Sequence, residues 1–194
     1  MQILNVLLAL ALVASSSAFL AGLFKESIAT VSQIDVNKYT GRWYQVYLSR
    51  WSSIFAPKGY CVTATYGKFN DTTITVFNSG RKGGPTGEEQ AIRGHAYATE
   101  ESGKFKLNLA GVPFTGNYWV IKLGPVINGQ YQYSVVSDTN RLGLYVLARD
   151  PETFKKYDAE VKEFLNKNHY NEWLNEPLPS YHDKDCIYPP MPTN

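Results

Sequence analysis

The middle of the chain, residues 42–149, consists of short segments in which apolar and polar side chains alternate. Between residues 104 and 110, for example, Phe105, Leu107 and Leu109 alternate with polar side chains. A period of two is typical of a β-strand with one buried and one solvated face. This pattern, together with enrichment in β-branched and aromatic residues, predicts eight strands, at residues 42–49, 61–68, 73–78, 90–99, 104–110, 118–123, 131–137 and 142–149.

Turn-forming residues separate most of these segments. Gly, Asn, Asp and Ser gather at residues 70–71, 80–87, 102–103, 128–129 and 138–140, where they favour tight connections. We expect residues 80–84 to lie in a flexible hairpin loop. Eight consecutive strands joined by short turns predict an all-β fold, an eight-stranded antiparallel up-and-down barrel. A barrel of this size can hold one small ligand.

The pattern changes after Arg149. Residues 150–152 (Asp-Pro-Glu) form a helix start, with an N-cap, a proline at the first position and an acid in the first turn. Apolar residues then recur at helical spacing, at Phe154, Tyr157, Val161, Phe164 and Leu165. We predict one C-terminal α-helix over about residues 151–167, packed outside the barrel, and an irregular proline-rich tail from residue 176 to residue 194.

The first 18 residues have the pattern of a secretory signal peptide. Residues 3–14 are apolar except for Asn5, and the small residues Ser16 and Ala18 stand where a signal peptidase reads the chain. The apolar stretch is short for a membrane span. We predict a signal peptide at residues 1–18 and one secreted, extracellular domain at residues 19–194, with no stable membrane span after cleavage. An uncleaved membrane anchor is the alternative.

Secretion would allow two modifications of the chain, a disulfide and an N-linked glycan. Cys61 and Cys186 are the two cysteines of the chain, and in an exported protein they are candidates for one disulfide that ties the tail to an early strand. Asn70, in the triplet Asn-Asp-Thr, is an N-glycosylation acceptor within a predicted turn.

Composition excludes several classes of protein. The chain has 194 residues, a formal net charge of +2, 44% hydrophobic residues and 14% aromatic residues, which indicates a compact domain rather than disorder. Its basic residues are scattered, so no nucleic-acid partner is expected. Two cysteines are too few for a four-cysteine zinc site or a disulfide-dense scaffold.

The sequence also lacks motifs for catalysis or for a cofactor. Residues 80–84 share only their composition with a phosphate-binding loop. Cys61 and His95 could in principle form a thiol–base couple, but alternation places Cys61 on the strand face opposite Tyr66, which favours a structural cysteine. Three histidines lie in unrelated segments at no zinc-ligand spacing: His95, His169 and His182. We predict no metal site and no cofactor.

Two motifs resemble signatures of the lipocalin family. The first is Gly41-Arg42-Trp43-Tyr44, preceded by a short helical turn at residues 35–39, and the second is Leu-Ala-Arg-Asp at residues 147–150. Residues 35–44, residues 61–66 and the tail cysteine are most similar to the apolipoprotein D branch. The resemblance covers essentially the whole mature domain. It departs from the family at residues 123–125, where Leu-Gly-Pro replaces the usual Thr-Asp-Tyr.

The resemblance implies that Gly41, Trp43 and Arg149 form a structural signature at the closed end of the barrel. A Trp ring has the area to plug that end. Arg149 is expected to lie across the Trp43 ring in a cation–π contact, while its forked donors reach the carbonyls of the turn at residues 35–39.

Alternation and the resemblance together predict the ligand-binding residues. If Arg149 faces inward, a period of two also turns Leu147 and Tyr145 inward. Tyr66 lies on the strand face opposite Cys61, and Lys82 is placed near the open mouth by the resemblance and by strand parity. The predicted ligand-binding set is Tyr66, Lys82, Leu109, Tyr118, Tyr145 and Leu147. Three phenols and one ammonium group suit an amphipathic ligand with one polar head, such as a carboxylate.

These observations predict a non-catalytic carrier for a small hydrophobic or amphipathic ligand, such as a fatty acid, a retinoid or a sterol. Two alternatives stay open. One is a lipocalin-fold enzyme that acts on a lipid through a thiol in the barrel, which would need a cysteine outside the disulfide. The other is a lipocalin that acts mainly by binding a receptor or another protein partner.

Overall fold

The structure is a computed structural model that describes residues 28–55 and 59–191. The predicted signal peptide, residues 1–18, lies outside the described residues. The strands are β1 (Gly41–Ser49), β2 (Gly59–Lys68), β3 (Thr73–Lys82), β4 (Glu88–Ala98), β5 (Lys104–Leu109), β6 (Gly116–Leu123), β7 (Val126–Ile127), β8 (Gln130–Tyr131), β9 (Tyr133–Ser137), β10 (Leu144–Ala148) and β11 (Pro177–Pro179). The helices are α2 (Val36–Tyr39), α3 (Arg50–Phe55), α4 (Pro151–Phe154) and α5 (Asp158–Lys167).

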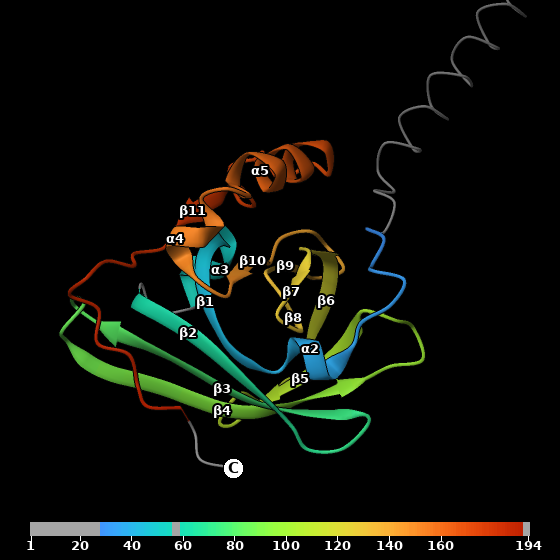
Figure 1. Cartoon of the computed structure of the whole chain (residues 1–194), viewed down its shortest axis with the longest axis horizontal. Helices are drawn as coiled ribbons and strands as arrows, with labels where there is room; N and C mark the ends of the chain where they lie inside the picture. The colour runs from blue at the N-terminus through green and yellow to red at the C-terminus, as the bar shows by residue number, and fades with distance from the viewer. Residues whose placement is uncertain (1–27, 56–58, 192–194) are drawn as a thin grey trace, which may run out of the picture.

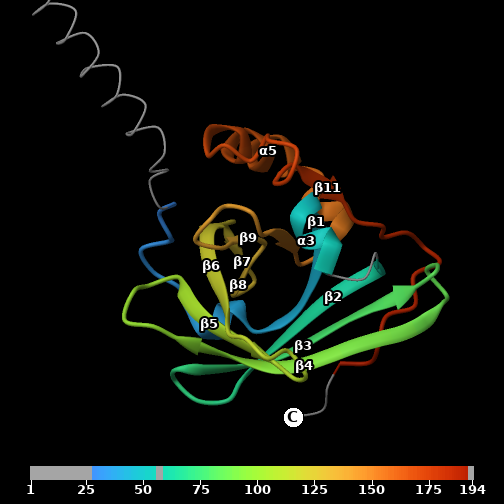
Figure 2. The ribbon, with the colours of Figure 1, turned by 180° about the vertical axis from the view of Figure 1, so that it is seen from behind.

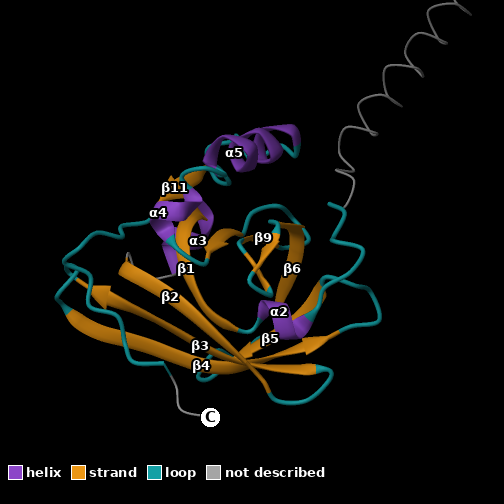
Figure 3. Cartoon of the chain, in the orientation of Figure 1, coloured by secondary structure: helices purple, strands orange, loops and turns teal. Residues whose placement is uncertain are grey.

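Eight antiparallel strands form a closed barrel (Figures 1 and 3). Neighbouring strands pair in the order β1, β2, β3, β4, β5, β6, β9 and β10, and β10 pairs back onto β1, where Tyr44 lies opposite Ala148. The predicted barrel with helix outside is therefore confirmed. Connections of such a barrel alternate between its ends, so α2 and the β4–β5 connection lie at one end, the closed end. The other end, the open end, carries α3 and residues 83–87, 110–115 and 138–143.

One connection is shorter than the sequence indicates. Residues 80–82 were expected in a flexible loop, but β3 continues through Lys82, which pairs with Glu88 of β4. That expectation was wrong. The glycines do not prevent backbone pairing here, because β3 and β4 are already paired continuously from Thr73 and Tyr97 onward. The turn itself is confined to residues 83–87 and begins with Gly83 at φ +81°, a conformation that suits glycine.

The departure from the family signature at residues 123–125 is followed by a small extra hairpin. Strands β7 and β8 pair through Ile127 and Gln130. Asn128 and Gly129 between them have φ values of +51° and +76°, as in the two-residue turns that favour Asn-Gly. The predicted strand at residues 131–137 is consequently interrupted, because Tyr131 belongs to this hairpin and β9 begins at Tyr133.

The predicted C-terminal helix is divided into α4 and α5. Asp150 caps α4 by accepting a hydrogen bond from the Thr153 amide at 2.6 Å. Between the helices, the amides of residues 155–157 donate to carbonyls three residues earlier, so this turn is wound more tightly than an α-helix. The predicted apolar stripe still faces the barrel, where Phe154, Val161 and Leu165 join an outer core cluster with strand residues.

The tail after β11 lies against the early strands (Figures 1 and 2). β11 pairs with the last residues of β1, and the Cys61 amide donates to the Tyr181 carbonyl at 3.0 Å. The Cys61–Cys186 disulfide fastens the tail to β2. Cys61 has φ +58° at a register shift between Tyr60 and Thr63, so a β-bulge aims its sulfur at the tail.

Within the described residues, every helix is too short or too polar to cross a membrane.

Candidate functional site in the barrel interior

The two faces of the last strand separate two core clusters. Val146 and Ala148 of β10 are buried outside the barrel, beneath α5. Leu147 and Tyr145 belong to an inner cluster that also contains Trp43 and Tyr66. Odd-numbered residues of β10 therefore face the barrel interior, and even-numbered residues face the helix, because successive strand residues alternate in direction.

Arg149 and Trp43 meet at the closed end. The guanidinium carbon lies 3.7 Å from the centre of the Trp43 ring, within cation–π range, and Trp43 has no exposed surface. The indole nitrogen of Trp43 donates to the Tyr39 carbonyl at 2.8 Å. Gly41, with φ +95°, precedes them, and a Cβ there would lie 3.2 Å from the guanidinium.

The donors of Arg149 are directed at backbone carbonyls. Nη1 donates to Arg42 at 2.8 Å, Nε donates to Tyr131 at 3.2 Å, and Nη2 donates to Lys38 at 3.0 Å and to Tyr39 at 3.2 Å. Burial lowers the pKa of Arg149 to about 10, so the group stays charged at neutral pH. The fork thus joins α2, β1 and the β8 region at the closed end.

Three phenols are linked above this plug. The hydroxyl groups of Tyr39 and Tyr118 lie 2.7 Å apart, and the Tyr118 hydroxyl donates to that of Tyr66 at 3.1 Å. The Tyr39 hydroxyl also lies 2.9 Å from Oγ of Ser134 in β9. The floor of the barrel interior is therefore a hydrogen-bonded row of hydroxyl groups.

Burial keeps these phenols protonated. It raises the pKa of Tyr39 to about 12, although the hydrogen bonds that Tyr39 shares with Ser134 and Tyr118 oppose the shift. Burial also raises the pKa of Tyr66 and of Tyr118 well above the usual value. The row therefore presents neutral hydroxyl groups at physiological pH.

Exposure inside the barrel rises away from the floor. Trp43, Tyr39 and Val120 are fully buried, or nearly so. Leu109 and Tyr145 pack against the same inner cluster but are only half-buried. Leu109 and Tyr145 therefore keep accessible surface on the inward face, whereas the side chains at the floor do not.

The structure places the six predicted ligand-binding residues at four positions along the barrel. Tyr66 and Tyr118 belong to the hydroxyl row of the floor, and Leu147 is buried with the plug. Leu109 and Tyr145 lie on the inner wall. Lys82 is exposed at the open end of β3, opposite Glu88 and Gly59, and shares strand parity with inward-facing Val76.

Three residues of the barrel interior were not predicted from the sequence. Tyr39 and Ser134 complete the hydroxyl row. Asn78 lies opposite Ala64 of the inner cluster, and its Oδ1 is shielded from solvent without a hydrogen-bond partner among the described residues. The sequence did contain a signal for Asn78. Val76 and Asn78 share one face of β3, so alternation would have identified Asn78 as a polar residue that faces inward.

The other predicted features lie outside the barrel interior. Asn70 is exposed in the β2–β3 connection, where its Oδ1 accepts a hydrogen bond from the Thr72 amide at 2.9 Å. His182 belongs to the tail and contacts β1; its Nε2 donates to the Gln45 carbonyl at 2.8 Å, and its Nδ1 accepts from the Tyr188 hydroxyl at 2.8 Å. Across residues 28–55 and 59–191, no three His, Cys, Asp or Glu residues are grouped to hold a metal ion.

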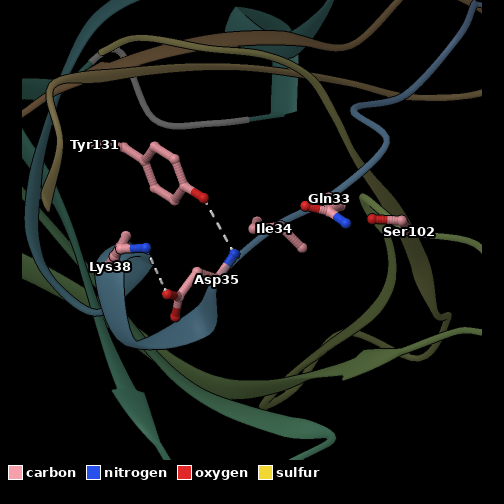
Figure 4. A pocket seen from close by; sticks show the side chains of 6 residues that line it. All are labelled: Gln33, Ile34, Asp35, Lys38, Ser102 and Tyr131. Carbon is pink, nitrogen blue, oxygen red and sulfur yellow. Dashed lines mark hydrogen bonds and ion pairs between the residues drawn. The ribbon is translucent and has the colours of Figure 1, made fainter. Parts of the chain in front are cut away.

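Two surface depressions are also outside the barrel. One of about 410 Å³ lies beside α2, where Asp35 pairs with Lys38 at 2.9 Å and its amide donates to the Tyr131 hydroxyl at 3.2 Å (Figure 4). The other, of about 490 Å³, lies between β1, α4 and the tail near His182. In the first depression the charged groups are already paired with each other, so the barrel interior is the better candidate site.

Comparison with known proteins agrees with this architecture. Residues 34–176 match the family model described as a lipocalin-like domain. Temperature-induced lipocalin-1 of Arabidopsis thaliana is 32% identical over 153 residues, which cover 72% of this chain and 77% of that protein. Outer membrane lipoprotein Blc of Vibrio cholerae is 36% identical over 128 residues, which cover 65% of this chain and 71% of that protein.

A solved structure shows the same fold at low identity. Lobster apocrustacyanin A1 has a TM-score of 0.58 at 14% identity, and the match covers 77% of this chain and 81% of that chain. The assignment to the apolipoprotein D branch stays a prediction.

Proposed function

Because the chain belongs to the lipocalin family, we propose that it is a secreted, non-catalytic carrier that binds one small hydrophobic or amphipathic molecule inside its barrel. The proposal is carried by the contrast in the barrel interior. Trp43 and Arg149 seal one end, while Leu109 and Tyr145 nearer the other end keep accessible surface. A barrel of eight strands has room for one such ligand.

The inner wall supports an amphipathic ligand. Leu109 and Tyr145 would pack against its apolar body, and Tyr66 and Tyr118 would meet the end that enters first. Lys82 at the open end would lie beside a group that stays near solvent. Leu147 would be the most buried of these contacts, because it is only 3% exposed.

Secretion is supported by the chemistry of the tail. The Cys61–Cys186 disulfide is typical of an oxidising compartment, and Asn70 is exposed where a glycan could be attached. With these features we propose that residues 1–18 are removed as a signal peptide and that residues 19–194 form one domain of the apolipoprotein D branch.

A thiol enzyme is the less favoured alternative. Both cysteines of the chain are joined in the disulfide, so thiol chemistry in the barrel would lack its nucleophile. A role in binding protein partners is the other alternative, and it becomes an outcome of the experiment below.

The carrier function is tested by mass spectrometry of lipids that co-purify with the protein from its native source, followed by titration with a fluorescent fatty acid. We expect a stoichiometric small lipid and saturable probe binding. Protein that is folded but carries no lipid and binds no apolar probe would overturn the carrier function and favour the protein-binding alternative.

A matched pair of variants locates the site. Leu109 faces the interior and is half-buried, whereas its neighbour Asn108 is exposed on the outer face. Leu109→Asp should abolish probe binding in a protein that stays folded, because a carboxylate would be desolvated against the ligand. Asn108→Asp should bind normally. Equal loss in both variants would place the ligand elsewhere.

A further inference from the structure

The hydrogen bonds between the hydroxyl groups at the barrel floor are all donated in the same direction along the row. The Tyr118 hydroxyl donates to Tyr66, and a phenol has only one proton to donate. Tyr118 must therefore accept from Tyr39, 2.7 Å away. Tyr39 has then used its own proton, so it accepts from Oγ of Ser134, 2.9 Å away. The chain of hydrogen bonds runs from Ser134 through Tyr39 and Tyr118 to Tyr66.

Tyr66 ends this chain with its own proton unused. Across residues 28–55 and 59–191, Tyr118 is the sole hydrogen-bond partner of the Tyr66 hydroxyl. Tyr66 is 6% exposed, and burial raises its pKa, so the proton stays on the oxygen. A buried donor without an acceptor is costly, and an acceptor atom on a ligand would remove that cost.

A second unsatisfied group lies on the neighbouring strand. Asn78 is two residues along β3 from Val76, the partner of Tyr66 in β2. Side chains at such diagonal positions lie on one face, about 7–8 Å apart. The shielded Oδ1 of Asn78 has no partner among the described residues. The barrel interior therefore holds one unused donor at its floor and one unused acceptor on its wall.

The floor is poorly suited to a carboxylate. A carboxylate has about four lone-pair sites to satisfy, and Tyr66 offers one proton. The positive charge nearby belongs to Arg149, whose donors are directed at four backbone carbonyls and which lies on the face of the Trp43 ring. A buried carboxylate would therefore be left largely unpaired.

Resting on the proposed carrier function, we propose that the ligand enters with an uncharged oxygen leading, a hydroxyl or carbonyl group that accepts the proton of Tyr66. A hydroxyl group would in addition have its own proton available for Oδ1 of Asn78. A ligand with a carboxylate would bind in the opposite sense, with the charged group beside Lys82 at the open end. Tyr66 is then the residue that selects the chemistry of the leading end.

The test compares all-trans-retinol with all-trans-retinoic acid, which share a carbon skeleton and differ in the polar end. Affinities are measured by fluorescence titration for the wild type, for Tyr66→Phe and for Tyr97→Phe. Tyr97 is a matched control because it lies on the exposed outer face of β4. Tyr66→Phe removes one hydroxyl group and keeps the ring that stacks on Tyr39.

We expect Tyr66→Phe to weaken retinol binding about tenfold, as for one hydrogen bond lost, and to change retinoic acid binding less than twofold. Tyr97→Phe should change neither affinity. If Tyr66→Phe weakens both probes equally, or neither of them, the proposed orientation is wrong while the carrier function stands. If the wild-type protein binds neither retinoid, the proposed orientation is overturned, and titration with the fluorescent fatty acid decides the carrier function separately.

Discussion

The guanidinium carbon of Arg149 lies over the indole ring of Trp43, 3.7 Å from the ring centre, while the donors of Arg149 reach carbonyls in three separate segments of the chain. One side chain thus joins the last strand, the first strand and α2. This contact closes one end of the barrel and forms the base on which the tyrosine row rests.

Replacing Arg149 by Ala should lower the free energy of unfolding by about 3 kcal/mol, because it removes the cation–π contact and leaves buried carbonyls unpaired. Urea denaturation measures the loss. Arg149→Lys is the matched control, since it keeps the positive charge but not the forked guanidinium. Its free energy of unfolding should lie between those of the wild type and Arg149→Ala. Ligand affinity of the folded variant should change little. Normal stability with tenfold weaker binding would instead place Arg149 in the ligand site.

Removing the disulfide should destabilise the fold strongly. Cys61 and Cys186 are separated by 125 residues, and closing a loop of that length stabilises the native state by roughly 4–5 kcal/mol on the chain-entropy account. The double variant Cys61→Ser, Cys186→Ser, compared with the oxidised wild type by urea denaturation, should show that loss. Non-reducing peptide mapping provides the control. Two free thiols in freshly secreted protein would contradict the assignment and revive the thiol enzyme.

Stability should fall on acidification through His182. Desolvation lowers the pKa of His182 below its usual value of 6.5, and its Nδ1 accepts a hydrogen bond from Tyr188 that protonation would break. The unfolded chain therefore binds the proton more readily. The stabilisation is complete above pH 6.5 and is lost as the pH falls toward the lower folded pKa.

The measurement is the urea midpoint between pH 7.5 and pH 5. His182→Gln should flatten the pH dependence, whereas replacing the exposed His169 by Asn should preserve it. A wild-type slope that survives in His182→Gln would assign the pH dependence to other groups.

Asn78→Leu should raise the free energy of unfolding of the ligand-free protein by about 1 kcal/mol, because an unsatisfied buried acceptor is replaced by an apolar group of similar volume. The measurement is urea denaturation after lipid has been extracted. Asn78→Asp is the contrasting variant and should destabilise, since it adds a charge at the same place. A loss of stability in Asn78→Leu would mean that the amide has a partner that the ligand-free barrel already supplies.

Much of the fold follows from local patterns. Alternation at Phe105, Leu107 and Leu109 identifies a strand and its inward face from the sequence alone, because the period of two depends only on neighbouring residues. The same reasoning, once Arg149 is turned inward, places Tyr145 and Leu147 in the inner cluster, where the structure has them. The sequence did not predict that β3 continues to Lys82 or that the C-terminal helix divides into α4 and α5. These boundaries depend on pairing and packing with distant segments.

The sequence by itself determined eight strands, the outer helical stripe and the two cysteines that could pair, because periodicity and residue chemistry are local properties of a chain. Only the tertiary structure decided how the hydroxyl groups of the floor are connected. Tyr39 is 79 residues from Tyr118 and 95 residues from Ser134, and neither contact exists until β10 closes onto β1 and α2 folds under the barrel. The direction of that hydrogen-bond chain, and with it the unused proton on Tyr66, arises from closure of the barrel.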